Sequence, residues 1–437
     1  MAKGDIPTPP GTGTVGKLTP DQKVLLREMW SQIFDMADHG TVNLPATPSA
    51  ETDSIASSSK QEPEKKKKSG GWFGTYKGSA SPAPSSSSAS DNNDTVRVNL
   101  ADIGLSADQL RPALWNNILG DHPDSLLLRF LRARKWNVAN GLNMILKAFK
   151  WRLEDDIEEV KANSEDALNE KYRGFRLQME MGKSFVHGQD NDGRPVVYIN
   201  VRLHKPADQD AKALEKFTIY VMETGRLMIT PPVETACLVF DMTGFSLANM
   251  DYNFVKFLVQ CFEAYYPESL GVLLIHKAPF VFWGVWKIIE PWLDPVVASK
   301  IKFTRSDSEL TQYIPANHLP DKYDGGKDKY QYEYIPVAAG ENDRMKDTET
   351  KERLVDEWKA LMWKFEALTR EWCDLSKPTN KSTRTESEVE AERDQAAKDL
   401  RAAYFRLDPY IRARTLYHRS EHPVLQGDGS SIWTYKN

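Results

Sequence analysis

The sequence predicts an α/β fold in which a largely buried sheet is covered by helices on at least one face. The strands expected at 236–241 and 272–275 are almost continuously apolar, which is typical of strands buried on both faces. Segments with helical periodicity alternate with these strands, as they do in α/β layers. The chain has 437 residues, enough for two or three domains.

The elements of the α/β region follow the turn at residues 190–195. We expect a strand at 196–201, a helix at about 212–228, a strand at 236–241, a helix at about 253–265, a strand at 272–275, a helix-forming stretch at 283–293 and a short strand at 301–303. Two amphipathic helices are expected before the turn. Their apolar faces contain Leu127, Phe130 and Leu131 in the first, and Val138, Leu142, Ile145, Leu146 and Phe149 in the second.

Both ends of the chain differ from this centre in composition. Residues 1–99 are rich in Ser, Pro, Gly and charge, so we expect them to be largely disordered. One amphipathic helix is expected there near 19–35, capped by Thr19 and begun by Pro20. Residues 336–437 predict a helical C-terminal extension, in which a break at 377–380 lets two helices fold back as a hairpin.

The amino-terminal helix and the tail admit two interpretations. Packing of both onto the central domain is favoured, because their apolar seams are narrow and short. The alternative is docking to a membrane or to a partner, and the lysine run at 65–68 could attract an anionic membrane surface. His418 and His422 lie four residues apart without a third ligand nearby, so we expect a solvated pair and no metal site.

Composition excludes several classes of protein. The 57 basic and 62 acidic residues give a net charge of −5, which argues against binding nucleic acid through overall charge. The three cysteines lie far apart and form no CxxC pair, as expected for a reducing compartment. Residues 1–20 contain no apolar targeting core, and the apolar stretch 278–286 is too short to span a membrane. We therefore expect a soluble intracellular protein that meets membranes only at their surface.

Catalytic motifs lack the context that their chemistry needs. The GxGxxG match at 11–16 follows Pro-rich sequence instead of a strand, and no GxSxG, HExxH or Walker motif occurs. We therefore expect no enzymatic activity and no cofactor.

Five segments in order carry a resemblance to a known family. They are residues 127–136 (LLRFLRARKW), 192–196 (DGRPV), 265–268 (YYPE), 277–280 (KAPF) and 293–301 (LDPVVASKI). Over about residues 100–326 the chain resembles the CRAL-TRIO lipid-binding family, and within it the fungal phosphatidylinositol transfer proteins. The resemblance implies a helical bundle at 100–175 and a CRAL-TRIO domain at 176–335, whose sheet floors an apolar cavity closed by a gate helix.

The resemblance also implies residue roles. In such transfer proteins a phosphoinositol head is held by basic residues and a carboxylate, which match Arg134, Lys135, Glu268 and Lys300 here. Charge-assisted hydrogen bonds of this kind offset the cost of burying a phosphodiester. His204 is a weaker polar candidate. The expected gate and cavity residues are Phe280, Phe282, Trp283, Trp286, Ile289, Trp292, Ala236 and Leu238.

Departures from the family pattern concern the second ligand. Relatives that exchange phosphatidylcholine have hydroxyl residues where this chain has Ala236 and Leu238, and an Arg and a Thr of the family pattern are Ser269 and Val297. We therefore expect phosphatidylinositol and a second, more apolar lipid that is not phosphatidylcholine.

The resulting expectation is a monomeric lipid transfer protein in the cytoplasm. It would associate transiently with the endoplasmic reticulum or other internal membranes and bind no nucleic acid. The alternative is a lipid-sensing scaffold that recruits a partner through its helical tail. Truncation after Gly340 is expected to separate the two, because a transfer protein would keep its activity and a scaffold would lose its partner.

Overall fold

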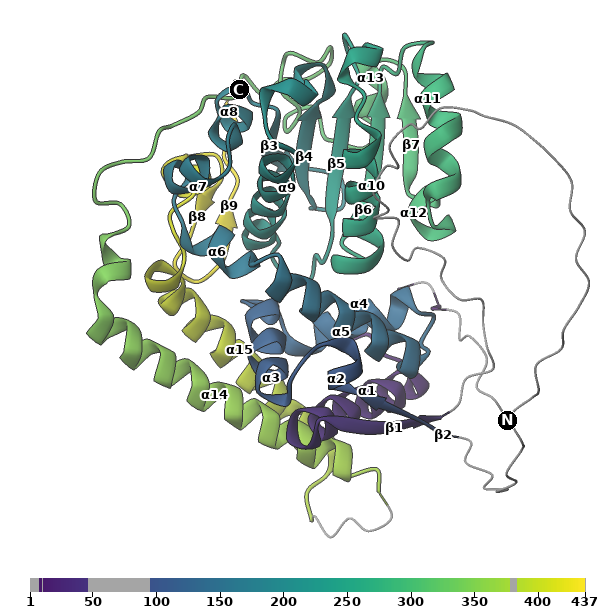
Figure 1. The fold of residues 1–437 in the computed structure, drawn as a ribbon, viewed down its shortest axis with the longest axis vertical. Helices are drawn as coiled ribbons and strands as arrows, with labels where there is room; N and C mark the ends of the chain where they lie inside the picture. Colours follow the sequence, from purple (N-terminus) through teal and green to yellow (C-terminus); the bar gives the residue numbers. More distant parts are fainter. Residues whose placement is uncertain (1–7, 10, 46–94, 378–382, 437) are drawn as a thin grey trace, which may run out of the picture.

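The computed structural model describes residues 8–9, 11–45, 95–377 and 383–436 (Figure 1). A five-stranded sheet has the order β3-β4-β5-β6-β7, with β3 antiparallel to β4 and the other neighbours parallel. The strands are β3 (Ser184–Gln189), β4 (Pro195–Asn200), β5 (Ala236–Asp241), β6 (Leu270–His276) and β7 (Ile301–Thr304). The α/β expectation is confirmed. Of the five strands of this sheet only β3 was not predicted, because its polar residues interrupt the apolar pattern.

Helices connect the parallel strands, as parallel pairing requires. Between β4 and β5 lie η1 (Val201–Leu203), η2 (Pro206–Asp208), α9 (Ala211–Gly225) and η3 (Arg226–Met228). Between β5 and β6 lie η4 (Leu247–Asn249), α10 (Tyr252–Gln260) and the π-helical turn η5 (Cys261–Tyr265). After β6 come α11 (Phe282–Ile289), η6 (Glu290–Trp292) and α12 (Pro295–Ser299), and α13 (Asp307–Leu310) follows β7.

A helical bundle lies below the sheet in Figure 1. It begins with α1 (Pro20–His39), which Thr19 caps as expected by accepting a hydrogen bond from the backbone N–H of Gln22. The other elements of the bundle are β1 (Thr41–Pro45), β2 (Thr95–Asn99), α2 (Leu100–Ile103), α3 (Ala107–Ile118), α4 (Pro123–Ala133) and α5 (Val138–Glu154). The short helices α6 (Ile157–Ala162), α7 (Glu165–Lys171) and α8 (Phe175–Glu180) follow and pack with α9. The strand pair β1-β2 was not predicted. Most of the expected disordered stretch, residues 46–94, lies outside the described residues.

The tail completes the core of the bundle. Helices α14 (Thr348–Asp374) and α15 (Glu386–Ile411) pack against each other as the expected hairpin. Trp30 of α1, Phe365 and Trp372 of α14 and Leu400 of α15 are buried in one apolar cluster with the bundle. Packing of both ends onto the folded domain is therefore confirmed. Truncation after Gly340 would remove part of this core, so that truncation cannot separate a transfer protein from a scaffold.

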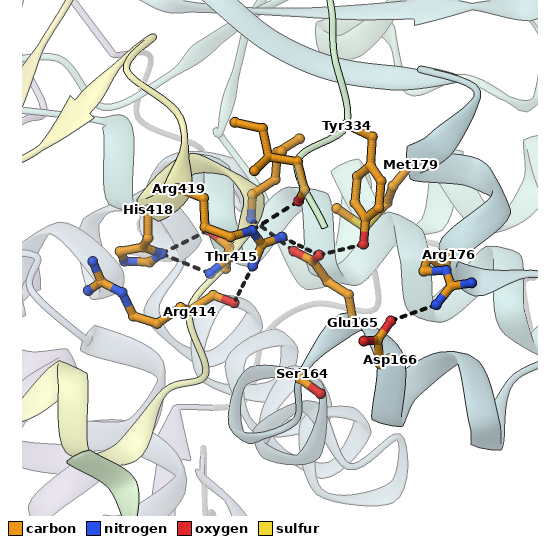
Figure 2. A network of polar contacts seen from close by, with 12 residues as sticks. Ser164, Glu165, Asp166, Arg176, Met179, Tyr334, Arg414, Thr415, His418 and Arg419 are labelled. Carbon is orange, nitrogen blue, oxygen red and sulfur yellow. Dashed lines mark hydrogen bonds and ion pairs between the residues drawn. The ribbon is translucent and has the colours of Figure 1, made fainter. Parts of the chain in front are cut away.

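The last residues dock beside the sheet. After the hairpin come α16 (Leu416–Arg419), β8 (Val424–Leu425) and β9 (Ser431–Ile432), whereas η7 (Asp343–Lys346) precedes the hairpin. Figure 2 shows Arg419 on Glu165 of α7, where Glu165 also accepts a hydrogen bond from the Tyr334 hydroxyl. His418 accepts a hydrogen bond from the Thr415 backbone, and burial lowers the pKa of His418 to about 3. The expectation of a solvated histidine pair is therefore wrong for His418.

Two observations bear on the membrane and cysteine expectations. Across the described ranges, no helix combines the length and apolar character that crossing a bilayer requires. Cys237, Cys261 and Cys373 are free and buried.

Candidate binding cavity

An apolar cavity lies between one face of the sheet, helices α9 and α10, and the bundle. Its empty volume, including solvent at its mouth, is about 1210 Å³. The residues that line it are Asn117, Leu126, Arg129, Phe130, Lys183, Ser184, Val197, Ile199, Leu214, Phe217, Thr218, Val221, Met222, Gly225, Arg226, Ile229, Glu234, Ala236, Leu238, Phe240, Phe254, Leu258, Phe262, Tyr265, Tyr266, Pro267 and Ser269.

The periodicity of each element explains which residues reach the cavity. Alternate residues of β5, namely Ala236, Leu238 and Phe240, line it, while Cys237 and Val239 pack into the core on the opposite face. On α9 the lining residues are one helical stripe at spacings of three and four: Leu214, Phe217, Thr218, Val221, Met222 and Gly225. Two of the eight expected gate and cavity residues, Ala236 and Leu238, therefore line the cavity.

Polar groups gather at the edge of the sheet where β6 and β7 begin. Glu268 precedes β6 and Lys300 precedes β7, and Lys300 Nζ lies 3.4 Å from Glu268 Oε2. Glu268 adopts a left-handed φ of 55° between the cavity residues Pro267 and Ser269. The structure thus brings together these two expected headgroup residues at the cavity rim.

The other two expected headgroup residues follow α4. Arg134 caps the carboxyl end of α4, and Lys135 has a left-handed φ of 48°. Burial raises the pKa of Glu263 in the η5 turn, and the positive charge of Arg134 opposes that rise. The charge of Arg134 therefore reaches Glu263, which lies five residues before Glu268 in the chain.

His204 lies apart from these four residues. It follows β4, at the opposite edge of the sheet, and its Nδ1 is 3.3 Å from Nζ of the cavity residue Lys183. Burial and the charge of Lys183 lower the pKa of His204 to about 4. The imidazole is therefore neutral at neutral pH.

Buried ion pairs that we did not predict join the bundle to the cavity wall. Arg152 of α5 donates to Glu223 of α9 at 2.8 Å, and the Tyr266 hydroxyl donates to the same carboxylate oxygen. Burial raises the pKa of Glu223, but Arg152, Arg226 and Lys161 together outweigh burial and hold that pKa well below its usual range. Charged residues inside otherwise apolar helix faces, such as Glu223, were the available sequence signal.

The expected gate helix packs on the sheet beside the cavity. Its inner face, formed by Phe282, Val285 and Ile289, is buried in an apolar cluster with β6 and the segment after β5. Trp283 and Trp286 contact the ring of Phe303 on β7. Six expected gate residues are absent from the cavity lining among the described residues: Phe280, Phe282, Trp283, Trp286, Ile289 and Trp292. In their place α10 supplies Phe254 and Leu258.

Together, the fold and the cavity define an α/β protein with a sheet-floored apolar cavity beneath a helical bundle. Sequence models of the CRAL/TRIO domain and of the CRAL/TRIO N-terminal domain match residues 179–325 and 92–147. The chain belongs to the CRAL-TRIO family, as the similarity of full-length relatives establishes.

The first of these relatives is the CRAL-TRIO domain-containing protein C3H8.02 of Schizosaccharomyces pombe. It is 38% identical over 94% of this chain and 92% of that protein. The phosphatidylinositol transfer protein CSR1 of Eremothecium gossypii is 33% identical over 93% of this chain and 97% of that protein. The crystal structure of Sfh5 matches 49% of this chain and 76% of that chain, with a TM-score of 0.40 and 21% identity.

Proposed function

We propose that the protein binds phosphatidylinositol and transfers it between membranes without catalysing a reaction. The observation that carries the proposal is the apolar cavity with the Glu268–Lys300 pair at its rim. The relationship to the transfer protein CSR1 supports the choice of lipid. Two acyl chains of about sixteen carbons carry on the order of 25 kcal/mol of exposure cost at about 0.8 kcal/mol per methylene, so the lipid must travel inside a cavity.

The proposed headgroup site pairs the phosphate with cations. Lys300, Lys135 and Arg134 would bind the phosphodiester, and Glu268 would accept hydrogen bonds from inositol hydroxyls. Lys300 is paired with Glu268, whose Oε2 lies 3.4 Å from Lys300 Nζ. A phosphate bound to Lys300 would therefore lie near a negative carboxylate, so the inositol ring must separate the phosphate from Glu268. Because Ala236 and Leu238 line the cavity wall, the proposed second ligand is an apolar lipid and not phosphatidylcholine.

Loss of both headgroup lysines tests this site. Lys135→Ala with Lys300→Ala is expected to remove copurified phosphatidylinositol and to lower its transfer between vesicles at least ten-fold, because charge-assisted hydrogen bonds are worth about 1.5–3 kcal/mol each. Native mass spectrometry measures the bound lipid. Lys302→Ala is the matched control, because Lys302 is exposed two residues away on β7. Phosphatidylinositol retained in the double variant contradicts the proposed site.

The gate is proposed to dock on a membrane through exposed apolar residues of α11 and of the segments on either side of it, residues 280–296. The exposed fractions of Phe280 and Trp283 are 92% and 41%, and Ile288 and Val296 are also exposed. Interfacial aromatic residues of this kind favour the headgroup region of a bilayer. Docking on this surface would place α11 against lipid. Separation of its inner face from the sheet would then uncover Phe240, a cavity residue that packs against the same apolar cluster.

Charge on this surface is expected to slow exchange. Phe280→Glu with Trp283→Glu places two carboxylates where the bilayer should be, so exchange between anionic vesicles should slow several-fold while thermal unfolding stays near that of the wild type. A fluorescence transfer assay measures the rate. Trp363→Glu, on an exposed tryptophan of α14, is the control. Unchanged exchange in the double variant would remove the gate assignment.

The scaffold alternative loses its main support. It relied on the apolar seam of the tail as a partner surface, and that seam is buried in the bundle core.

A further inference from the structure

Lys183 is a buried cation in the wall of the apolar cavity. Only 4% of the residue is exposed, and it lines the cavity directly before β3. Both backbone groups of Lys183 form hydrogen bonds. Its N–H donates to the carbonyl of Gln178, and its carbonyl accepts from the N–H of Asn200. The backbone of Lys183 is therefore fixed to the end of the sheet.

The polar contacts of Lys183 are neutral. Its Nζ lies 3.3 Å from His204 Nδ1 and 3.3 Å from Gln209 Oε1. Within the described part of the chain it forms no ion pair, and Asp208 acts on it only from a distance. An ammonium has three N–H donors, so two acceptors leave one donor for a ligand.

Burying the charge of the Lys183 ammonium without an ion pair costs free energy. Desolvation lowers the pKa of Lys183 to about 8, so it is still mostly charged at neutral pH. His204 remains neutral there and offers Nδ1 as an acceptor. A bound anion would compensate the charge that the protein itself leaves uncompensated.

The position of Lys183 separates it from the proposed phosphoinositol site. Ser184 pairs with Ile199, Ile199 with Phe240, and Ala236 with Leu270 in the sheet register. These pairs form two rows across the sheet, one through Ala236 and one through Phe240. Because the two residues are four apart on β5, the distance between the rows is about 13 Å at ~3.3 Å per residue. Lys183 lies beyond the second row and Glu268 before the first, so the apolar wall of β4 and β5 separates two polar ends.

We propose that Lys183, oriented by His204 and Gln209, binds the carboxylate of a long-chain fatty acid whose hydrocarbon chain lies along the apolar wall. The proposal rests on lipid binding in this cavity and specifies the polar end of the second ligand. Ion pairs within the protein already hold the other charged lining residues, Arg129, Arg226 and Glu234. Of the described residues that line the cavity, Lys183 is therefore the one unpaired cation and matches one carboxylate in charge, and a carboxylate at the end of a straight chain is a small anion.

Oleate, methyl oleate and octadecane test this assignment on the delipidated full-length protein. The wild type is expected to bind oleate at least ten-fold more tightly than methyl oleate, which has no charge. Lys183→Met should weaken oleate binding about ten- to hundred-fold and leave octadecane binding unchanged. Equal affinity of the wild type for oleate and its ester, or unchanged oleate binding in Lys183→Met, would overturn the proposal.

A second buried lysine provides the control. Lys216 of α9 is buried to a similar extent but does not line the cavity, and its Nζ donates to the backbone carbonyl of Asp155. Lys216→Met should therefore keep the preference for oleate. Phosphatidylinositol transfer measured on the same samples separates the two proposals. Transfer that persists without an oleate preference overturns only the Lys183 site, whereas loss of all lipid binding in the wild type overturns the proposed function.

Discussion

Replacing Glu165 by alanine is expected to lower the free energy of unfolding by about 3–5 kcal/mol and to release the end of the tail from the cavity wall. Glu165 is fully buried and accepts hydrogen bonds from Tyr220, Tyr334 and the backbone of Leu416. It also pairs with Arg419, as Figure 2 shows. Removing the carboxylate leaves several buried donors without their acceptor.

Loss of this network should also affect the cavity. Tyr220 lies on α9, and another face of the same helix lines the cavity. Urea denaturation measures the stability, and limited proteolysis after residue 411 measures release of the tail. Glu170→Ala is the matched control, because Glu170 is exposed on the same helix. A Glu165→Ala variant with wild-type stability and an intact tail would show that this network does not hold the segment.

Replacing Arg393 by methionine is expected to cost about as much, 3–5 kcal/mol, because it leaves the carboxylate of Asp124 buried and without its cation. Arg393 Nη2 lies 2.8 Å from Asp124 Oδ1, and Arg393 Nε donates to Thr369. The guanidinium also lies 4.2 Å from the ring centroid of Trp372. Trp30 donates to the same oxygen of Asp124. This cluster therefore ties α1, α4, α14 and α15 together.

The pH dependence of this cost has a definite sign. Burial alone raises the pKa of Asp124, but Arg393, with smaller contributions from His122 and Trp30, outweighs burial and holds that pKa below the ordinary value of 3.8. The stability from a lowered carboxyl pKa is fully present above that ordinary value and is lost as pH falls through the folded-state pKa. The stability difference between wild type and Arg393→Met should therefore be largest at neutral pH and shrink below about pH 4.

An exposed arginine on the same helix calibrates the measurement. Arg406→Met breaks a surface pair with Glu357 and should change stability by less than about 1 kcal/mol. Equal effects of the two arginine substitutions, or a constant difference across pH, would mean that the Asp124–Arg393 pair is not the link between tail and bundle.

Local patterns predicted most of the fold. The strand at 236–241 has its expected bounds because its apolar run is short and bounded by polar residues. The tail hairpin also follows from its sequence periodicity and its break. By contrast, β3 was missed because an edge strand needs few apolar residues, and α11 was expected at the cavity although α10 lines it. Periodicity identifies the apolar face of a helix but not the element that covers it.

The sequence by itself determined an α/β chain, the apolar strands of the cavity wall, and the motifs around Arg134, Glu268 and Lys300. Only the tertiary structure decided that Glu268 and Lys300 meet at the cavity rim, while His204 joins Lys183 at the opposite edge of the sheet. The reason is physical. Burial and pairing of a charge depend on residues distant in sequence, so a lysine between Gly182 and Ser184 carries no local sign that it faces an apolar cavity without a carboxylate partner.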